Sequence, residues 1–465
     1  MPVIRDWIAG MAGAILMVQA LIMLHCGELA AMDRASSGDF GVELSDSITI
    51  ATTGARNPTV AVDSGAGSIY LAWAQESRPP QEQTGYNPTD PRLEALLTRS
   101  DDGGRNFSEP VVVNGPREDI RSHTVSPTKV AVGKSGEVYV LYNRKDADIA
   151  LPDGNFRSRN QLRLARSEDH GQSFKDRISL ASEDVEGVVG SPGMINLFVA
   201  ANGDLYASWL DYREMFSYLI KNRKEPPKGF PVDTQLRVAR SSDSGRSFRP
   251  STLVTKPVCG CCGTHVAQGK SGPLYASTRA AWPELQGSVD AVRDIVVAAS
   301  PDQGRSWAKA VKIHDDQFKI SACPDVAPGL AVDSKGRLHA AWYTGSERNP
   351  GVFYAVSTDQ GKSFSEPLEL LSDEWVPYAD VKLALDAKDN AWVAFEDRRG
   401  DIDLIHLARV SPEGHVSRAE PWPGTIPDIA TRADSAVVTF GTLPAGEDEH
   451  GGSVQLRIAR PGSGS

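Results

Sequence analysis

The amino-acid sequence predicts an all-β fold, a β-propeller of four-stranded blades, and three observations lead to this prediction. The chain of 465 residues contains 42 glycines and 30 prolines, which is typical of a fold with many tight turns. A Ser-x-Asp-x-Gly-x-x-aromatic motif recurs five times along the chain. Around these motifs, short apolar runs return in the same order, four to each unit of about 60 residues, and this pattern is the signature of propeller blades.

The recurring motif is suited to a tight turn between two strands. Its aspartate can accept hydrogen bonds from turn amides, its glycine can adopt a positive φ, and its aromatic residue can pack beneath the turn. We therefore expect these aspartates to hold turns and not to act in catalysis. The five copies begin at Ser100, Ser167, Ser241, Ser300 and Ser357, and a degenerate sixth copy begins at Ser411.

The strand sets add up to seven blades in one domain over residues 42–461. The first six blades are expected to begin near Arg56, His123, Gly190, Cys259, Cys323 and Tyr378, and a weaker seventh unit follows them. This last unit lacks an outer strand, and residues 47–50 could supply one, which would close the ring and remove a free sheet edge. Six blades followed by a C-terminal extension is the alternative.

The N-terminal segment has the pattern of a targeting signal. Arg5 precedes an apolar run over residues 7–24, and Ala30 and Ala31 offer small residues for a cleavage site. Residues 1–31 are therefore expected to be a signal peptide or an N-terminal membrane anchor. We expect an exported protein that is periplasmic or secreted, or that is tethered to a membrane by this segment.

Charge limits the classes of partner. The net charge is −11, and the chain has no long basic run, so we expect no nucleic acid as a partner. A net negative charge does not exclude an acidic ligand, because a local cluster of arginines can override it.

A propeller that carries these motifs, known as Asp-boxes or BNR repeats, resembles the sialidase (neuraminidase) superfamily over nearly the whole mature chain. Sialidases begin their first blade with an Arg-x-Pro motif, and Arg56-Asn57-Pro58 is similar to it. The resemblance implies that Arg56, Arg279 and Arg348 form a clamp for the carboxylate of the sugar, with Glu396 supporting the first arginine. Three planar guanidinium groups suit such a carboxylate.

The same resemblance implies the catalytic residues. Tyr378-Ala379-Asp380 is similar to the motif that carries the family's tyrosine nucleophile, and Asp90 matches the acid/base. A tyrosine nucleophile needs a nearby base for its phenolic proton. The family has a glutamate in this role, whereas Gln268 stands at the matching position and cannot take the proton. The chain therefore departs from the sialidase pattern at a catalytic position.

A Cys-Gly-Cys-Cys run opens the fourth blade and does not belong to the sialidase pattern. Cys259 and Cys323 each lie thirteen positions before the glycine of the next turn, so we expect them at equivalent places on adjacent blades. Disulfides are one interpretation and a copper or zinc site of thiolates with His265 or His123 is the other, with free thiols remaining if neither holds. Both interpretations use Cys259, Cys261, Cys262 and Cys323.

The residues leave two functions open. One is an exo-α-sialidase, a glycoside hydrolase that releases terminal sialic acid or a related acidic sugar and needs no cofactor for this chemistry. The other is a non-catalytic propeller that binds glycan, protein or a metal through the cysteine cluster. In either case we expect a glycan or another small acidic ligand on the face where the innermost strands begin and the loops after the second strands gather.

Overall fold

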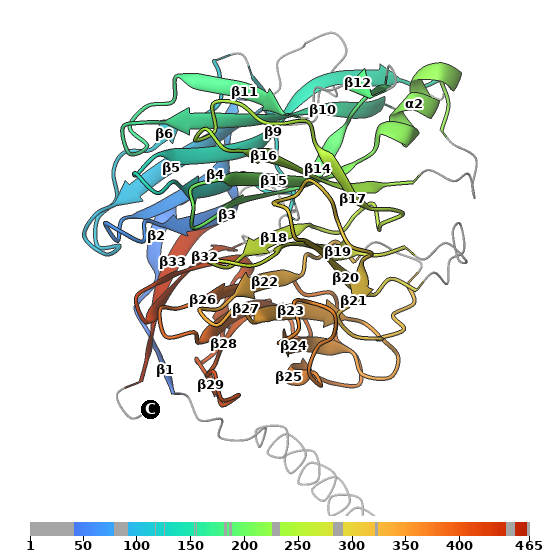
Figure 1. The fold of residues 1–465 in the computed structure, drawn as a ribbon. Helices are drawn as coiled ribbons and strands as arrows, with labels where there is room; N and C mark the ends of the chain where they lie inside the picture. The colour runs from blue at the N-terminus through green and yellow to red at the C-terminus, as the bar shows by residue number, and fades with distance from the viewer. Residues whose placement is uncertain are drawn as a thin grey trace, which may run out of the picture.

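The computed structural model describes residues 41–78, 92–116, 118–124, 126–152, 154, 156–180, 184–185, 188–225, 233–281, 292–320, 324–442 and 452–462. The strands in these ranges form seven sheets of four or five strands, arranged as the blades of a propeller (Figure 1). The innermost strands follow one another around the ring, and the first blade packs against the last. The prediction of an all-β propeller with seven blades is confirmed, and the six-blade alternative is wrong.

The first four blades run in chain order from the innermost strand outward. They consist of β3 (Ala55–Val62), β4 (Ile69–Arg78), β5 (Arg92–Ser100) and β6 (Val111–Val112); β7 (Ile120–Arg121), β8 (Lys129–Val132), β9 (Val138–Ala150), β10 (Phe156–Ser167) and β11 (Asp176–Leu180); β14 (Pro192–Val199), β15 (Leu205–Asp211), β16 (Gln235–Ser241) and β17 (Thr252–Thr255); and β18 (His265–Gln268), β19 (Leu274–Arg279), β20 (Ile295–Ser300) and β21 (Val311–Lys312).

The last three blades complete the ring. They consist of β22 (Gly329–Val332), β23 (Leu338–Thr344), β24 (Gly351–Ser357) and β25 (Leu368–Ser372); β26 (Val381–Leu385), β27 (Ala391–Asp397), β28 (Leu404–Val410), β29 (Val416–Arg418) and β30 (Trp422–Pro423); and β31 (Thr425–Arg432), β32 (Ser435–Thr442) and β33 (Ser453–Pro461) with β1 (Val42–Leu44) and β2 (Ile48–Ala51).

Two short elements lie outside the blades. They are the helix α2 (Arg213–Asn222), which follows β15, and a hairpin of β12 (Asp184–Val185) and β13 (Val188–Val189). In the part of the chain that the structure describes, no helix has the length and apolar character needed to cross a membrane. The expected signal peptide or anchor, residues 1–31, lies outside the described residues.

Strands from the N-terminal part of the chain close the ring. β2 pairs with β33 and places Thr49 opposite Gln455, as the missing outer strand of the seventh unit predicts. β1 pairs with the following part of β33 and places Val42 opposite Pro461 (Figure 1). The N-terminal strands thus cover the edge that the last C-terminal strand would otherwise expose.

Apolar layers between neighbouring blades fix the positions of the strands. The second strands β15, β23 and β27 are buried along their whole length. Each of four second strands carries a fully buried tryptophan, and each indole N–H has a polar partner, as a buried indole requires. These tryptophans are Trp73, Trp209, Trp342 and Trp392. The strand ends, from which the loops of the site extend, are therefore held in place.

The Ser-x-Asp-x-Gly turns share one hydrogen-bond pattern. In all five, the serine Oγ donates to the aspartate Oδ1 over 2.6–2.9 Å, and the glycine N–H donates to the serine Oγ over 2.7–2.9 Å. The glycine φ angles lie between 77° and 89°. Hydrogen bonds from Asn106 to Asp102 and from Ser306 to Asp302, with smaller contributions from the turn serines, lower the pKa of both aspartates to about 2, so the carboxylates stay charged and hold the turns.

Candidate functional site

A pocket of about 380 Å³ lies between the first three blades, at the face where β3, β8 and β14 begin. This is the face on which the sequence predicts a ligand. The pocket is lined by Arg56, Leu93, Asp119, Ile120, Arg121, Ser122, His123, Ser126, Asn143, Lys145, Asn160, Gly193, Met194 and Tyr212. Its volume falls in the range of about 300–1,000 Å³ that is usual for small-molecule sites.

Cationic side chains outnumber acidic ones in the pocket lining. Arg56, Arg121 and Lys145 contribute positive charge, and Lys145 is only 5% exposed. Asp119 is the one carboxylate among the lining residues, and burial raises its pKa. Arg56 also pairs with Glu76, a carboxylate outside the lining. The pocket therefore favours an anionic ligand.

Two asparagines among the lining residues carry buried, unpaired acceptor atoms. The Nδ2 atom of Asn143 donates to Ser126 Oγ over 3.2 Å, and that of Asn160 donates to the Pro192 carbonyl over 3.4 Å. Both Oδ1 atoms are buried and have no hydrogen-bond partner among the described residues. Each unpaired buried acceptor costs about 1–3 kcal/mol.

Local backbone geometry positions the pocket residues. Asn57 has a φ of 53° at an irregularity in β3, and its Nδ2 atom donates to Ser122 Oγ over 2.9 Å, which ties the first blade to the loop before β8. Gly193 leaves room for the ring of Tyr212, because a Cβ atom there would lie 2.8 Å from its Cε2 atom. The Tyr212 hydroxyl donates to the Gly260 carbonyl over 2.7 Å, so this ring joins the pocket to the Cys-Gly-Cys-Cys loop.

The three arginines of the predicted clamp lie in three different environments. Arg56 lines the pocket. Arg279 has no exposed surface, and its guanidinium donates to the backbone carbonyls of Arg293 and Tyr343 over 2.6 and 2.8 Å. Arg348 is exposed on the loop after β23. Neither Arg279 nor Arg348 lines the pocket, so the structure does not bring the three guanidinium groups together around one ligand.

Glu396 does not support Arg56. It accepts hydrogen bonds from Arg398 Nη2 over 2.9 Å and from the Ile426 amide over 2.6 Å, whereas Arg56 pairs with Glu76. The prediction that paired Glu396 with the first arginine is therefore wrong. Glu396 lies near the end of β27 in the sixth blade, where it forms an ion pair with Arg398, two positions along the chain.

Tyr378 belongs to the same group as Arg398. Its side chain is 46% exposed, and the Arg398 guanidinium carbon lies 5.1 Å from the centre of its ring. Burial raises the pKa of Glu396, the carboxylate that pairs with Arg398. The structure thus brings Tyr378 and Glu396 together through Arg398, outside the pocket described above.

Gln268 and Tyr378 belong to different blades and lie at opposite ends of their inner strands. It is the last residue of β18, and its Nε2 atom donates to the Gly272 carbonyl in the following turn over 3.3 Å. Tyr378, by contrast, precedes the first residue of the inner strand β26. The position aligned with the family's base is therefore not beside Tyr378. Asp90, the predicted acid/base, lies outside the described residues.

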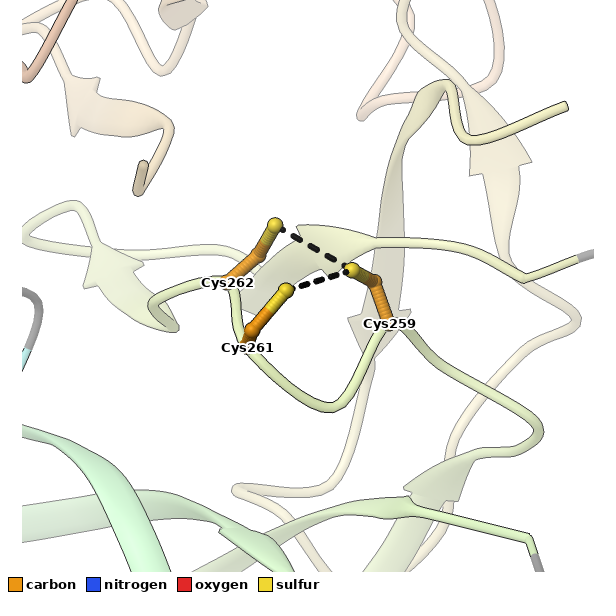
Figure 2. A group of neighbouring side chains, drawn as sticks. All are labelled: Cys259, Cys261 and Cys262. Atoms are coloured by element: carbon orange, nitrogen blue, oxygen red, sulfur yellow. Dashed lines mark hydrogen bonds between the residues drawn. The ribbon is translucent and has the colours of Figure 1, made fainter. Parts of the chain in front are cut away.

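Three of the four predicted cysteines form a cluster. Cys259, Cys261 and Cys262 are free, and their sulfur atoms lie within 4.8 Å of one another (Figure 2). Hydrogen bonds from the other two thiols, together with the charge of Arg293, lower the pKa of Cys259. Burial raises the pKa of Cys262. Cys323 lies outside the described residues.

His265 is not part of this cluster. Its Nδ1 atom lies 3.2 Å from the Pro328 carbonyl oxygen, and its ring lines a smaller cavity among the inner strands, with Lys129, Lys382 and Asp428. Burial and the two lysines lower the pKa of His265 to about 3. His265 is therefore neutral at pH 7 and lines the central cavity instead of contacting the cysteines.

Several pocket residues were not predicted from the sequence. Arg121 directly precedes the inner strand region of the second blade, much as Arg56 opens that of the first, and this repeat position could have identified it. Lys145, Asn143 and Asn160 had no such signal, because they lie within the long strands β9 and β10 and belong to no recurring motif.

Comparisons with known proteins bear on the fold. No protein-family model matches the chain, and no curated protein matches it. Among solved structures, a protein of unknown function from Dyadobacter fermentans DSM 18053 is 14% identical, with a TM-score of 0.51 over 90% of this chain and 99% of that chain. An ulvan lyase of polysaccharide lyase family PL25 is 10% identical, with a TM-score of 0.52 over 87% of this chain and 94% of that chain. These two likenesses show the propeller fold.

A sialidase is also among the similar structures. A Hadza microbial sialidase is 14% identical, with a TM-score of 0.47 over 79% of this chain and 66% of that chain.

Proposed function

We propose that the propeller binds a saccharide that carries a carboxylate, and that it does so in the pocket between the first three blades. The observation that carries this proposal is the convergence of Arg56, Arg121 and Lys145 on a pocket with one lining carboxylate, Asp119. Guanidinium and ammonium groups form charge-assisted hydrogen bonds with carboxylates, which are about twice as strong as neutral ones.

The neutral lining supports a sugar over a simple anion. Tyr212 and Met194 offer apolar surface to a sugar ring, and Asn143 and Asn160 add neutral polar side chains to the lining. An inorganic anion would leave this neutral surface without a partner.

Calorimetric titration tests the proposal. The probes are sialic acid, a glucuronate-containing oligosaccharide and a neutral oligosaccharide of the same length. The glucuronate probe is chosen because the similar ulvan lyase was solved bound to -[GlcA(1-4)Rha3S]-. We expect binding of at least one acidic probe, with an affinity at least about tenfold above that of the neutral one, which corresponds to about 1.4 kcal/mol.

Variants connect this binding to the pocket. Arg121→Met and Lys145→Met should each weaken binding of the acidic probe by about tenfold or more, because each removes one charge-assisted contact. Arg348→Met is the matched control, since Arg348 is exposed and does not line the pocket. Equal affinity for acidic and neutral probes, or equal loss in all three variants, would contradict the proposal.

A second candidate function is exo-α-sialidase hydrolysis at Tyr378. The observation that favours it is the half-exposed Tyr378 ring beside Arg398, which itself pairs with the buried Glu396. A fluorogenic sialoside tests it. Release of sialic acid by the wild type and its loss in Tyr378→Phe would support hydrolysis. Binding without turnover would instead support a non-catalytic, glycan-binding propeller.

A further inference from the structure

The Cys-Gly-Cys-Cys loop presents three sulfur atoms at one point. Cys259 Sγ lies 3.4 Å from Cys261 Sγ and 3.3 Å from Cys262 Sγ, and Figure 2 shows all three side chains directed toward one another. The loop precedes β18 and contributes no residue to the lining of the saccharide pocket, although Gly260 accepts a hydrogen bond from Tyr212, so this inference does not depend on the proposed function.

Hydrogen bonds from its own blade and from the two neighbouring blades hold the loop in this shape. The Cys259 amide donates to the Arg279 carbonyl over 2.9 Å, and the Gly263 amide donates to the Val326 carbonyl over 3.3 Å. The Tyr212 hydroxyl donates to the Gly260 carbonyl between the first two cysteines. The convergence of the sulfur atoms is therefore fixed by backbone contacts on both sides of the loop, before any ion binds.

The surroundings of the cluster suit a negatively charged complex. Arg293 Nη1 lies 3.4 Å from Cys259 Sγ and can donate to it. The charge of Arg279 also acts on the Cys262 thiol. Three thiolates around a monovalent ion carry two net negative charges, and these two buried or partly buried cations can offset them. Cys261 is the least buried of the three and offers an approach from solvent.

We propose that Cys259, Cys261 and Cys262 form a binding site for Cu(I) with three thiolate ligands. Soft thiolate ligands select Cu(I), zinc and iron–sulfur clusters. Structural zinc is almost always four-coordinate, and the described residues supply no fourth ligand to this cluster. Around an ion at a metal–sulfur distance of about 2.3 Å, three sulfurs in a plane lie about 4.0 Å apart, so Cys259 Sγ needs to move away from each of the other two by about 0.6–0.7 Å.

A competition titration tests this site on the full-length protein. The protein is reduced, freed of metal, and titrated with Cu(I) under anaerobic conditions against a chromophoric Cu(I) chelator. We expect one Cu(I) per chain, a thiolate-to-copper absorption in the ultraviolet, and an X-ray absorption spectrum with a shell of sulfur neighbours only. Native mass spectrometry should show the added mass of one copper, which is lost with excess chelator.

Two variants give the matched comparison. Cys261→Ser should weaken Cu(I) binding by about a hundredfold or more, and it should fold because Cys261 is partly exposed. His265→Gln should bind Cu(I) as the wild type does, since His265 lies outside the cluster. Lys145→Met should likewise retain copper, which separates failure of this site from failure of the saccharide pocket.

Three results would overturn the proposal. The first is a mass that is two hydrogens short in the unreduced protein together with no Cu(I) uptake after reduction, which would make the cluster a disulfide site. The second is zinc that binds with one-to-one stoichiometry and that Cu(I) cannot displace. The third is equal Cu(I) uptake by the wild type and Cys261→Ser.

Discussion

Replacing Arg279 with methionine distinguishes a structural arginine from a ligand-binding one. Arg279 is completely buried, donates two hydrogen bonds to backbone carbonyls, and lies with its guanidinium carbon 5.1 Å from the centre of the Phe318 ring. Hydrogen bonds to charged groups contribute about 1.5–3 kcal/mol each, and the contact with Phe318 adds about 1 kcal/mol. Methionine recovers part of the packing, so Arg279→Met should lower the free energy of unfolding by about 3–5 kcal/mol.

Calorimetry and titration together read out this effect. At about 2.1 cal/mol/K per residue, a domain of this size has an unfolding entropy near 0.9 kcal/mol/K, so the midpoint temperature should fall by about 3–6 °C. The affinity of the folded variant for an acidic saccharide should not change. Arg348→Met should alter neither quantity, since exposed substitutions usually stay within about 0.5 kcal/mol. An Arg279→Met protein of unchanged stability that no longer binds the saccharide would refute this reasoning and restore the predicted clamp.

Three further predictions concern pH and ring closure. The pKa of His265 is lowered to about 3, so between about pH 6.5 and 3 the unfolded chain binds a proton that the folded chain does not. Acidification over this range should lower the free energy of unfolding by up to about 1.4 kcal/mol per pH unit. Urea unfolding at several pH values should show a smaller pH dependence of this free energy for His265→Gln than for the wild type, and an equal pH dependence would contradict the prediction. The turn aspartates have lowered pKa values, so their contribution to stability is present above about pH 4 and is lost as the pH falls toward 2. Between these pH values the midpoint temperature of Asp102→Ala should fall less than that of the wild type, as measured by thermal scans. A larger fall in the variant would count against the prediction. A chain that begins at residue 53 should unfold at a lower temperature than one that begins at residue 41, and it should aggregate, because β33 loses both outer partners. Indistinguishable melting curves and size-exclusion elution profiles would argue against this role of β1 and β2.

The fold could be predicted from the sequence because each blade repeats a local pattern. The turn motifs act through hydrogen bonds within five residues, as between Ser241 and Gly245, so their effect does not depend on the rest of the chain. The missing outer strand of the last unit was also visible as an incomplete repeat. Both signals are independent of how neighbouring blades pack.

The candidate site could be predicted only in part, because it depends on contacts between blades. Arg279 has the residue type and the repeat position that predict a ligand-binding arginine. Its guanidinium instead donates hydrogen bonds to the backbone carbonyls of Arg293 and Tyr343. The charge of the pocket comes partly from Lys145, which is buried by its neighbours rather than marked by any motif. The proximity of Cys259, Cys261 and Cys262 could be predicted because the three lie within four consecutive residues of one loop, whereas His265, predicted as a further ligand, lies outside the cluster.

The pairing of β1 with β33 also determines where the chain can be cut and rejoined. The Gly462 amide donates to the Gly41 carbonyl over 2.7 Å, so the two ends of the ring lie next to each other. A short linker between them, with new ends opened in a turn between two blades, would preserve every strand pair. During synthesis β1 leaves the ribosome before β33, so the ring cannot close until β33 has been made.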